Sequence, residues 1–76
     1  MNVADLLATL HHEVASRAYF RRLDVLEQTA TLLKARLPIS VGLFVQVYRN
    51  DRFDTTNFVL IHNGQRIYAR DQLDGV

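Results

Sequence analysis

The feature that most constrains this chain is an Asn63-Gly64 dipeptide that lies between two apolar runs. The first run is Phe58–Ile61, and the second is Ile67-Tyr68. Both residues of the dipeptide tolerate the positive φ angles that a type I′ turn requires. The pattern therefore predicts a tight β-hairpin between Thr55–His62 and about Gln65–Arg70.

The register of this hairpin follows by counting outward from a two-residue turn. One face then holds the pairs His62–Gln65, Leu60–Ile67 and Phe58–Ala69, and the other holds Ile61–Arg66, Val59–Tyr68 and Asn57–Arg70. The first face is the more apolar, so it is expected to pack on the rest of the core.

A further strand is predicted before the hairpin. From Val41 to Tyr48 the apolar residues alternate with a period of two, and β-branched and aromatic types dominate. The polar cluster Arg49–Arg52 then predicts a turn. Together with the hairpin, this strand forms a three-stranded antiparallel meander.

The first part of the chain has helical spacing. Val3, Leu7, Leu10 and Val14 recur every three or four residues, and Asn2 is a suitable N-cap. A second stripe, which ends before Pro38, consists of Leu23, Leu26, Ala30, Leu33 and Leu37. At about 100° per residue the two stripes point in nearly opposite directions, which predicts a break within Ser16–Arg22. The alternative is one long helix held between two subunits of a dimer, and Val25 and Leu32 remain as surplus apolar positions on the second helix.

These elements predict one α+β domain over residues 1–76, in the order ααβββ. Two N-terminal helices, or one long kinked helix, pack on a three-stranded antiparallel meander. The predicted core consists of Leu7, Leu10, Val14, Leu26, Leu33, Leu37, Val41, Leu43, Val45, Val47, Phe58, Leu60 and Ile67.

Composition limits the classes of function. The chain has no cysteine and a net charge of +1, so it has neither a disulfide framework nor a general attraction to nucleic acid or to anionic membranes. No apolar run approaches the ~20 residues of a membrane span, and Met1–Asp5 does not resemble a signal peptide. A cytoplasmic location is expected. Apolar residues make up 49% of this small chain, which favours burial against a partner, either a second copy or another protein.

The last residues contain an Asp74-Gly75 turn signal with one residue after it. Turn chemistry that leads to no further element predicts that the natural chain continues past Val76.

No catalytic or cofactor motif stands out. His11-His12-Glu13 lacks the second histidine, four residues on, that a zinc site of this type requires. The chain also has no Gly-rich phosphate loop, no nucleophile elbow and no cysteine nucleophile. We therefore expect no metal, no cofactor and a non-enzymatic role.

Arginines and aromatic residues suggest a second class of function. Tyr19 and Phe20 lie between arginines, a combination that can bind RNA through phosphate contacts and base stacking. The candidate nucleic-acid-binding residues are Arg17, Arg21, Arg22, Arg66 and Arg70. His62 and Tyr68 are candidates for proton transfer in an RNA-cleaving version of this site.

The segment Gly64–Asp71, which follows a helix-rich start, resembles small proteins of the TumE-type toxin–antitoxin class. Those proteins have a strand with an aromatic residue, an arginine and an aspartate near its end, followed by a His-containing segment. The printed sequence contains no such segment after Asp71, so no functional residue is transferred from that class.

The first hypothesis is thus a protein-interaction or homodimerisation module. The alternative is an RNA-binding or RNA-cleaving domain of toxin–antitoxin type. Clustering of the arginines on one surface would favour the alternative, and scattering among carboxylates would favour the module.

Overall fold

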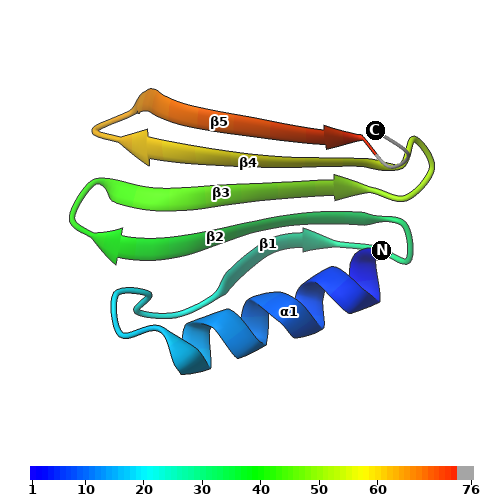
Figure 1. The fold of residues 1–76 in the computed structure, drawn as a ribbon, viewed down its shortest axis with the longest axis horizontal. Coiled ribbons are helices and arrows are strands. Elements are labelled where there is room, and N and C mark those ends of the chain that lie inside the picture. Colours follow the sequence, from blue (N-terminus) through cyan, green and yellow to red (C-terminus); the bar gives the residue numbers. More distant parts are fainter. Residues whose placement is uncertain (74–76) are drawn as a thin grey trace.

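The computed structural model describes the backbone of residues 1–73 and the side chains of residues 1–70, so the Asp74-Gly75 turn signal lies outside it. These residues form one helix followed by a five-stranded antiparallel sheet, in which the strands lie side by side in chain order (Figure 1). The elements are α1 (Val3–Ser16), β1 (Asp24–Gln28), β2 (Leu32–Ser40), β3 (Leu43–Asn50), β4 (Thr55–His62) and β5 (Gln65–Leu73).

The first helix is confirmed. Asn2 caps α1, and its side-chain oxygen accepts a hydrogen bond of 2.8 Å from the backbone N–H of Asp5. Val3, Leu6 and Leu10 are buried on the face that packs against the sheet. The helix ends at Ser16, where the predicted break begins.

The second predicted helix is wrong, and so is the order ααβββ. Residues Leu23–Leu37 instead contribute β1 and most of β2, so the order is αβββββ. The apolar pattern of this segment fits both a helix and a strand. Leu33 and Leu37, which are four residues apart, also fit a period of two once Ala35 is included. All three are buried on one face of β2. Val25 and Leu32 therefore lie on strands, and they do not form a surplus helical face.

Local chemistry accounts for the turn within this segment and for the position of Pro38. Thr29 follows directly after β1, and its hydroxyl accepts hydrogen bonds from the backbone N–H groups of Thr31 and Leu32, which closes the β1–β2 turn. Pro38 does not end a helix. It lies in β2 next to an irregularity between Pro38 and Ser40, where the missing N–H is tolerated.

The predicted strand from Val41 to Tyr48 starts two residues too early. Val41 and Gly42 form the turn between β2 and β3, where Gly42 has a φ of +73° and Val41 is 97% exposed. A left-handed φ interrupts a strand, and glycine adopts it without a Cβ penalty. The alternation of apolar residues therefore extends into the β2–β3 turn, and for this reason it misplaced the start of the strand.

The Asn63-Gly64 hairpin is confirmed, since both residues have positive φ angles of 51° and 81°. Its register is confirmed for His62–Gln65 and Ile61–Arg66 only. A bulge then leaves Ile67 without a partner, and the following pairs are Leu60–Tyr68, Val59–Ala69 and Phe58–Arg70. The bulge moves Tyr68 to the face of the sheet that carries Leu60.

The core lies between α1 and the sheet. Of the predicted core, Leu10, Leu33, Leu37 and Val47 are buried, and Leu7, Val14, Val45 and Phe58 pack on them while partly exposed. Leu43 and Leu60 are half-buried, whereas Leu26, Val41 and Ile67 are exposed, so the prediction is wrong for these three. Leu26 and Ile67 lie at bulges of edge strands, and Val41 lies in a turn.

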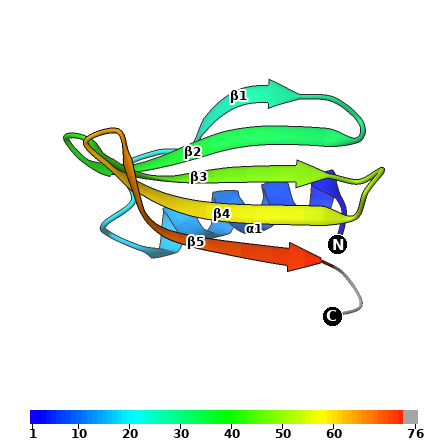
Figure 2. The ribbon, with the colours of Figure 1, turned by 90° about the horizontal axis from the view of Figure 1, so that it is seen from above.

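The helix covers only part of one face of the sheet. Its buried residues pack on β2 and on Val47 of β3. Figure 1 draws α1 on the β1 side of the sheet, with β5 on the opposite side, and Figure 2 shows it behind β3 and β4. This incomplete cover leaves apolar side chains of β3 and β4 next to open space.

Candidate functional site

The first candidate site is a groove on the helix side of the sheet, which we call the helix-side groove. Its floor and walls are apolar or aromatic, and they come from β3, β4, β5 and the connection between α1 and β1. We define it by Tyr19, Phe20, Val45, Phe58, Leu60 and Tyr68.

The walls of the helix-side groove are aromatic. Tyr19 and Phe20 contact each other with ring centroids 4.6 Å apart and planes inclined by 57°. On the opposite wall, Tyr68 of β5 is 62% exposed. The cavity has a volume of about 340 Å³, and a second cavity of about 470 Å³ continues from it along α1 past Leu10. Among the described side chains that line the first cavity, only the two tyrosines carry a polar group.

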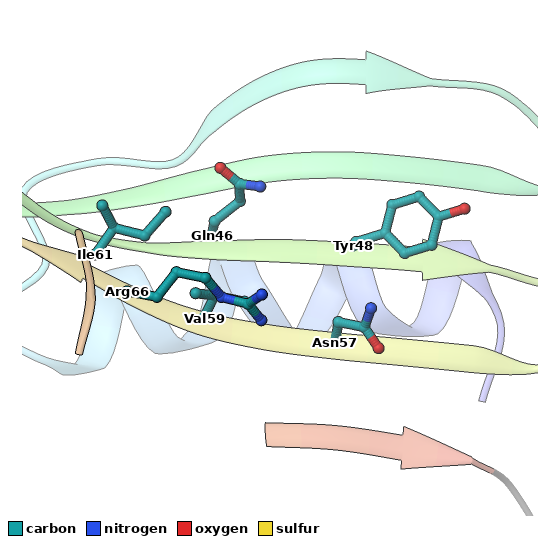
Figure 3. A pocket seen from close by; sticks show the side chains of 6 residues that line it. All are labelled: Gln46, Tyr48, Asn57, Val59, Ile61 and Arg66. Atoms are coloured by element: carbon teal, nitrogen blue, oxygen red, sulfur yellow. The ribbon is translucent and has the colours of Figure 1, made fainter. Parts of the chain in front are cut away.

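The second candidate site lies on the opposite face, which we call the outer face. Its cavity of about 390 Å³ is lined by Gln46, Tyr48, Asn57, Val59, Ile61 and Arg66 (Figure 3). Arg66 reaches from the start of β5 across β4, and its guanidinium lies beside Val59 (Figure 3). On the same face, the guanidinium of Arg36 lies 4.7 Å from the centre of the Phe44 ring.

A third cluster of polar residues surrounds Arg49, where the start of α1 meets the β3–β4 loop, and its role is structural. Arg49 is only 2% exposed, and its guanidinium donates to Asp51, Thr56, Asp54 and the carbonyl of Met1 over 2.7–3.0 Å. Asp51 also accepts from the backbone N–H of Val3, at 3.1 Å. The Arg49 guanidinium, together with the Val3 N–H, lowers the pKa of the Asp51 carboxyl. This cluster fixes the start of α1 to the β3–β4 loop.

The five candidate arginines do not gather on one surface. Arg17 pairs with Glu13, which raises the pKa of Arg17, and Arg22 pairs with Asp24 at 2.8 Å. Arg21 donates to the backbone carbonyl of Ile39 at 3.0 Å. Arg66 lies on the outer face, and Arg70, opposite Phe58, lies on the helix side.

The candidate proton-transfer residues His62 and Tyr68 are both exposed. Within residues 1–70, neither side chain forms a hydrogen bond that would orient it for proton transfer. His12 lies within 3.3 Å of the Ser16 hydroxyl, and the described part of the chain has no group of three residues that could hold a metal ion.

The residue pattern did not predict two features of these sites. The bulge at Ile67, which places Tyr68 in the groove, has no signal in the residue types. The burial of Arg49, in contrast, had one, because the alternation Val45, Val47, Arg49 places the arginine on the aliphatic face of β3. A charged residue in phase with an apolar face indicates a buried polar network.

The fold and the two faces define a small α+β protein with a partly covered antiparallel meander. No protein-family model, no curated protein and no solved structure matches this chain. Over the described residues, no helix is long and apolar enough to cross a membrane.

Proposed function

We propose that this chain is a non-enzymatic, cytoplasmic protein-interaction module that binds an amphipathic helix of a partner protein in the helix-side groove. One observation carries the proposal: α1 packs over β2, while the apolar face of the sheet continues to β4 and β5 without a covering element among the described residues. An exposed apolar groove with few polar groups is typical of a surface that binds another chain.

The dimensions of the sheet favour a helix as the occupant. Five strands about 4.8 Å apart make a sheet roughly 19 Å wide. Helices pack about 8–10 Å from one another, so one helix covers only about half of such a face. The remaining half accepts a second helix that lies beside α1 and over Phe58 and Leu60.

The chemistry of the groove favours a partner over a second copy. The apolar face of α1 is already buried against its own sheet, and its exposed face carries Asp5, Thr9 and His12. A second copy therefore has no free apolar helix, within the described residues, to place in the groove. Arg70 lies on the helix side next to the groove, which favours an acidic residue beside the apolar stripe of the partner helix.

The scatter of the five candidate arginines also supports this proposal. Two of them are paired with carboxylates, and a third is held by a backbone carbonyl. The set therefore provides no common phosphate-binding surface. A homodimer remains the alternative within the same class, with the grooves of two copies in contact.

The test uses a synthetic amphipathic peptide with leucine at positions i, i+3, i+4 and i+7, titrated into the protein by NMR. We expect shift changes at Phe20, Phe58, Leu60 and Tyr68, and none at Tyr48. Tyr68→Lys should weaken binding about tenfold or more, because it places a charge on the apolar wall.

Phe53→Lys is the matched control, since Phe53 is also an exposed aromatic residue, 74% exposed against 62% for Tyr68, and lies in the β3–β4 loop outside the groove. Equal effects of the two substitutions, or shift changes centred on the outer face, would contradict the proposal. Light scattering of the free protein examines the alternative: a dimer that dissociates on Tyr68→Lys would make a second copy the occupant.

A further inference from the structure

The outer face of the sheet has chemistry that the helix-side groove lacks. It combines aromatic rings, guanidinium groups and a side-chain amide from three strands of the sheet, with β4 lying between the second and the third: Arg36 on β2, Phe44, Gln46 and Tyr48 on β3, and Arg66 on β5. We infer that this face is a binding platform for single-stranded nucleic acid. The inference is independent of the helix-side groove, which lies on the other side of the sheet.

The charges of the outer face favour an anionic ligand. Arg36 and Arg66 have no carboxylate partner among the side chains that the structure describes. Of the carboxylates whose side chains the structure describes, Asp24 and Glu27 lie opposite Arg36 and Lys34 in the sheet, and they are paired with Arg22 and Lys34. Two guanidinium groups that no described carboxylate neutralises can therefore each contact a phosphate.

The aromatic groups supply stacking surfaces. Phe44 and Tyr48 are both half-buried on the outer face of β3, and four residues along a strand span roughly 13 Å. The Tyr48 hydroxyl accepts a hydrogen bond of 3.2 Å from the Asn50 side chain, which holds the ring in place. The guanidinium carbon of Arg36 lies over the Phe44 ring, 4.7 Å from its centre, and guanidinium planes stack on bases as aromatic rings do.

Gln46 lies between the two stacking positions and lines the cavity. Its amide forms no hydrogen bond to a described residue, so it is free to donate to and accept from the edge of an unpaired base. A duplex hides these edges and its base faces, so the platform selects for single strands.

The experiment is a fluorescence-anisotropy titration with labelled single-stranded RNA and DNA of the same sequence, and with the corresponding duplex. We expect the single strands to bind at about 50 mM salt and the affinity to fall toward 200 mM. Two phosphate contacts predict a slope of about −1.4 in a plot of log affinity against log salt, since each contact contributes about −0.7. The RNA and DNA arms show which sugar the platform prefers.

Substitutions separate the contribution of the phosphate contacts from that of base stacking. Arg66→Gln should reduce the steepness of the salt dependence by about 0.7. Tyr48→Leu keeps the apolar contact with the sheet and should weaken binding about 5- to 150-fold without changing the slope. Arg52→Gln is the charge-matched control, because Arg52 is exposed in the β3–β4 loop and lies on neither candidate site. The NMR spectrum of each variant checks its fold.

Absence of binding by either single strand at about 50 mM salt would overturn the inference. Duplex binding as tight as single-strand binding would overturn it too, because stacking on the platform requires unpaired bases. The same holds if Arg52→Gln weakens binding as much as Arg66→Gln does, since the attraction would then be general and not local to the outer face.

Discussion

At the scale of single residues, Arg49 connects the first residues of the chain to the β3–β4 loop. Its guanidinium joins the carbonyl of Met1, the β3–β4 loop and Thr56 of β4. A planar fork of N–H donors suits such a set of partners, whereas a single ammonium group does not. All of its buried polar neighbours are hydrogen-bonded, so the network is complete.

Arg49→Lys should lower the free energy of unfolding by about 1–3 kcal/mol, because at least one buried acceptor loses its donor. Urea denaturation measures the change. Arg52→Lys, in the adjacent exposed loop, is the control and should stay within about 0.5 kcal/mol. Equal effects of the two substitutions would mean that the hydrogen bonds of the Arg49 guanidinium do not contribute to the free energy of unfolding.

Asp51 should make the stability depend on pH. Its pKa is lower in the folded protein than in the unfolded chain, where it lies near 4. The stabilisation is therefore present above about pH 4 and is lost as the pH falls through the folded pKa. The measurement is the urea midpoint of the unsubstituted protein and of Asp51→Asn, taken at several pH values from neutral to acid. The difference between the two midpoints should be largest at neutral pH. A difference that stays constant down to acid pH would contradict this cause.

At the scale of elements, the β2–β3 and β4–β5 turns contact each other. The backbone N–H of Asn63 donates to the carbonyl of Gly42 at 2.8 Å. A Cβ atom on Gly42 would lie 2.4 Å from the Asn63 side-chain oxygen, whereas a Cβ on Gly64 would meet nothing within 4 Å. The two glycines thus have similar φ angles and very different surroundings.

Gly64→Ala should cost about 1–2 kcal/mol of stability for its left-handed φ alone. Gly42→Ala should cost at least about 1 kcal/mol more, because Asn63 must also move. Thermal unfolding of both variants, and of Gly42→Ala combined with Asn63→Gly, measures the excess. The excess should vanish in the double variant, and equal costs for the two single variants would show that the Asn63 amide moves without penalty.

The same elements show how much the residue pattern determines. The Asn-Gly hairpin, the N-cap at Asn2 and the face of β4 that packs inward all follow from local chemistry. The secondary structure of Leu23–Leu37 could not be predicted, because its leucines fit both the helical period of 3.6 and the strand period of two. Only the sheet that forms around Ala35 selects the strand. The Ile67 bulge depends on pairing with a strand, so no local signal reveals it.

The candidate surfaces also divide into features that local residue types predict and features that depend on how the elements pack. The aromatic and polar character of the outer face of β3 is visible in the alternation of Phe44, Gln46 and Tyr48. The arginine that extends over this face, Arg66, could be placed because it lies near the turn, before the bulge. The helix-side groove could not be predicted, since it depends on where α1 lies and on how Tyr68 emerges from the bulge.

At the scale of the whole molecule, protection should be uneven across the sheet. β2 is paired on both sides and lies under α1, whereas β5 pairs only with β4 among the described strands. Backbone opening is easiest where burial and pairing are least.

Hydrogen exchange measured by NMR should therefore be slowest in β2 and the facing half of β3, and fastest in the two edge strands, β1 and β5. Binding of the amphipathic peptide should slow exchange in β5, because Tyr68 becomes covered. If β5 in the free protein exchanged as slowly as β2, the groove wall would be more rigid than its contacts indicate.

The hydrogen bond between Val3 and Asp51 links residues 48 positions apart. During synthesis the ribosome releases the helical segment first, but the carboxylate that holds its first turn comes much later. At about 5–20 residues per second, the helix waits roughly 2–10 s for this partner and for the strands that bury its apolar face. For that time the nascent chain presents an uncovered amphipathic segment, the kind of surface that chaperones at the ribosomal exit protect from aggregation.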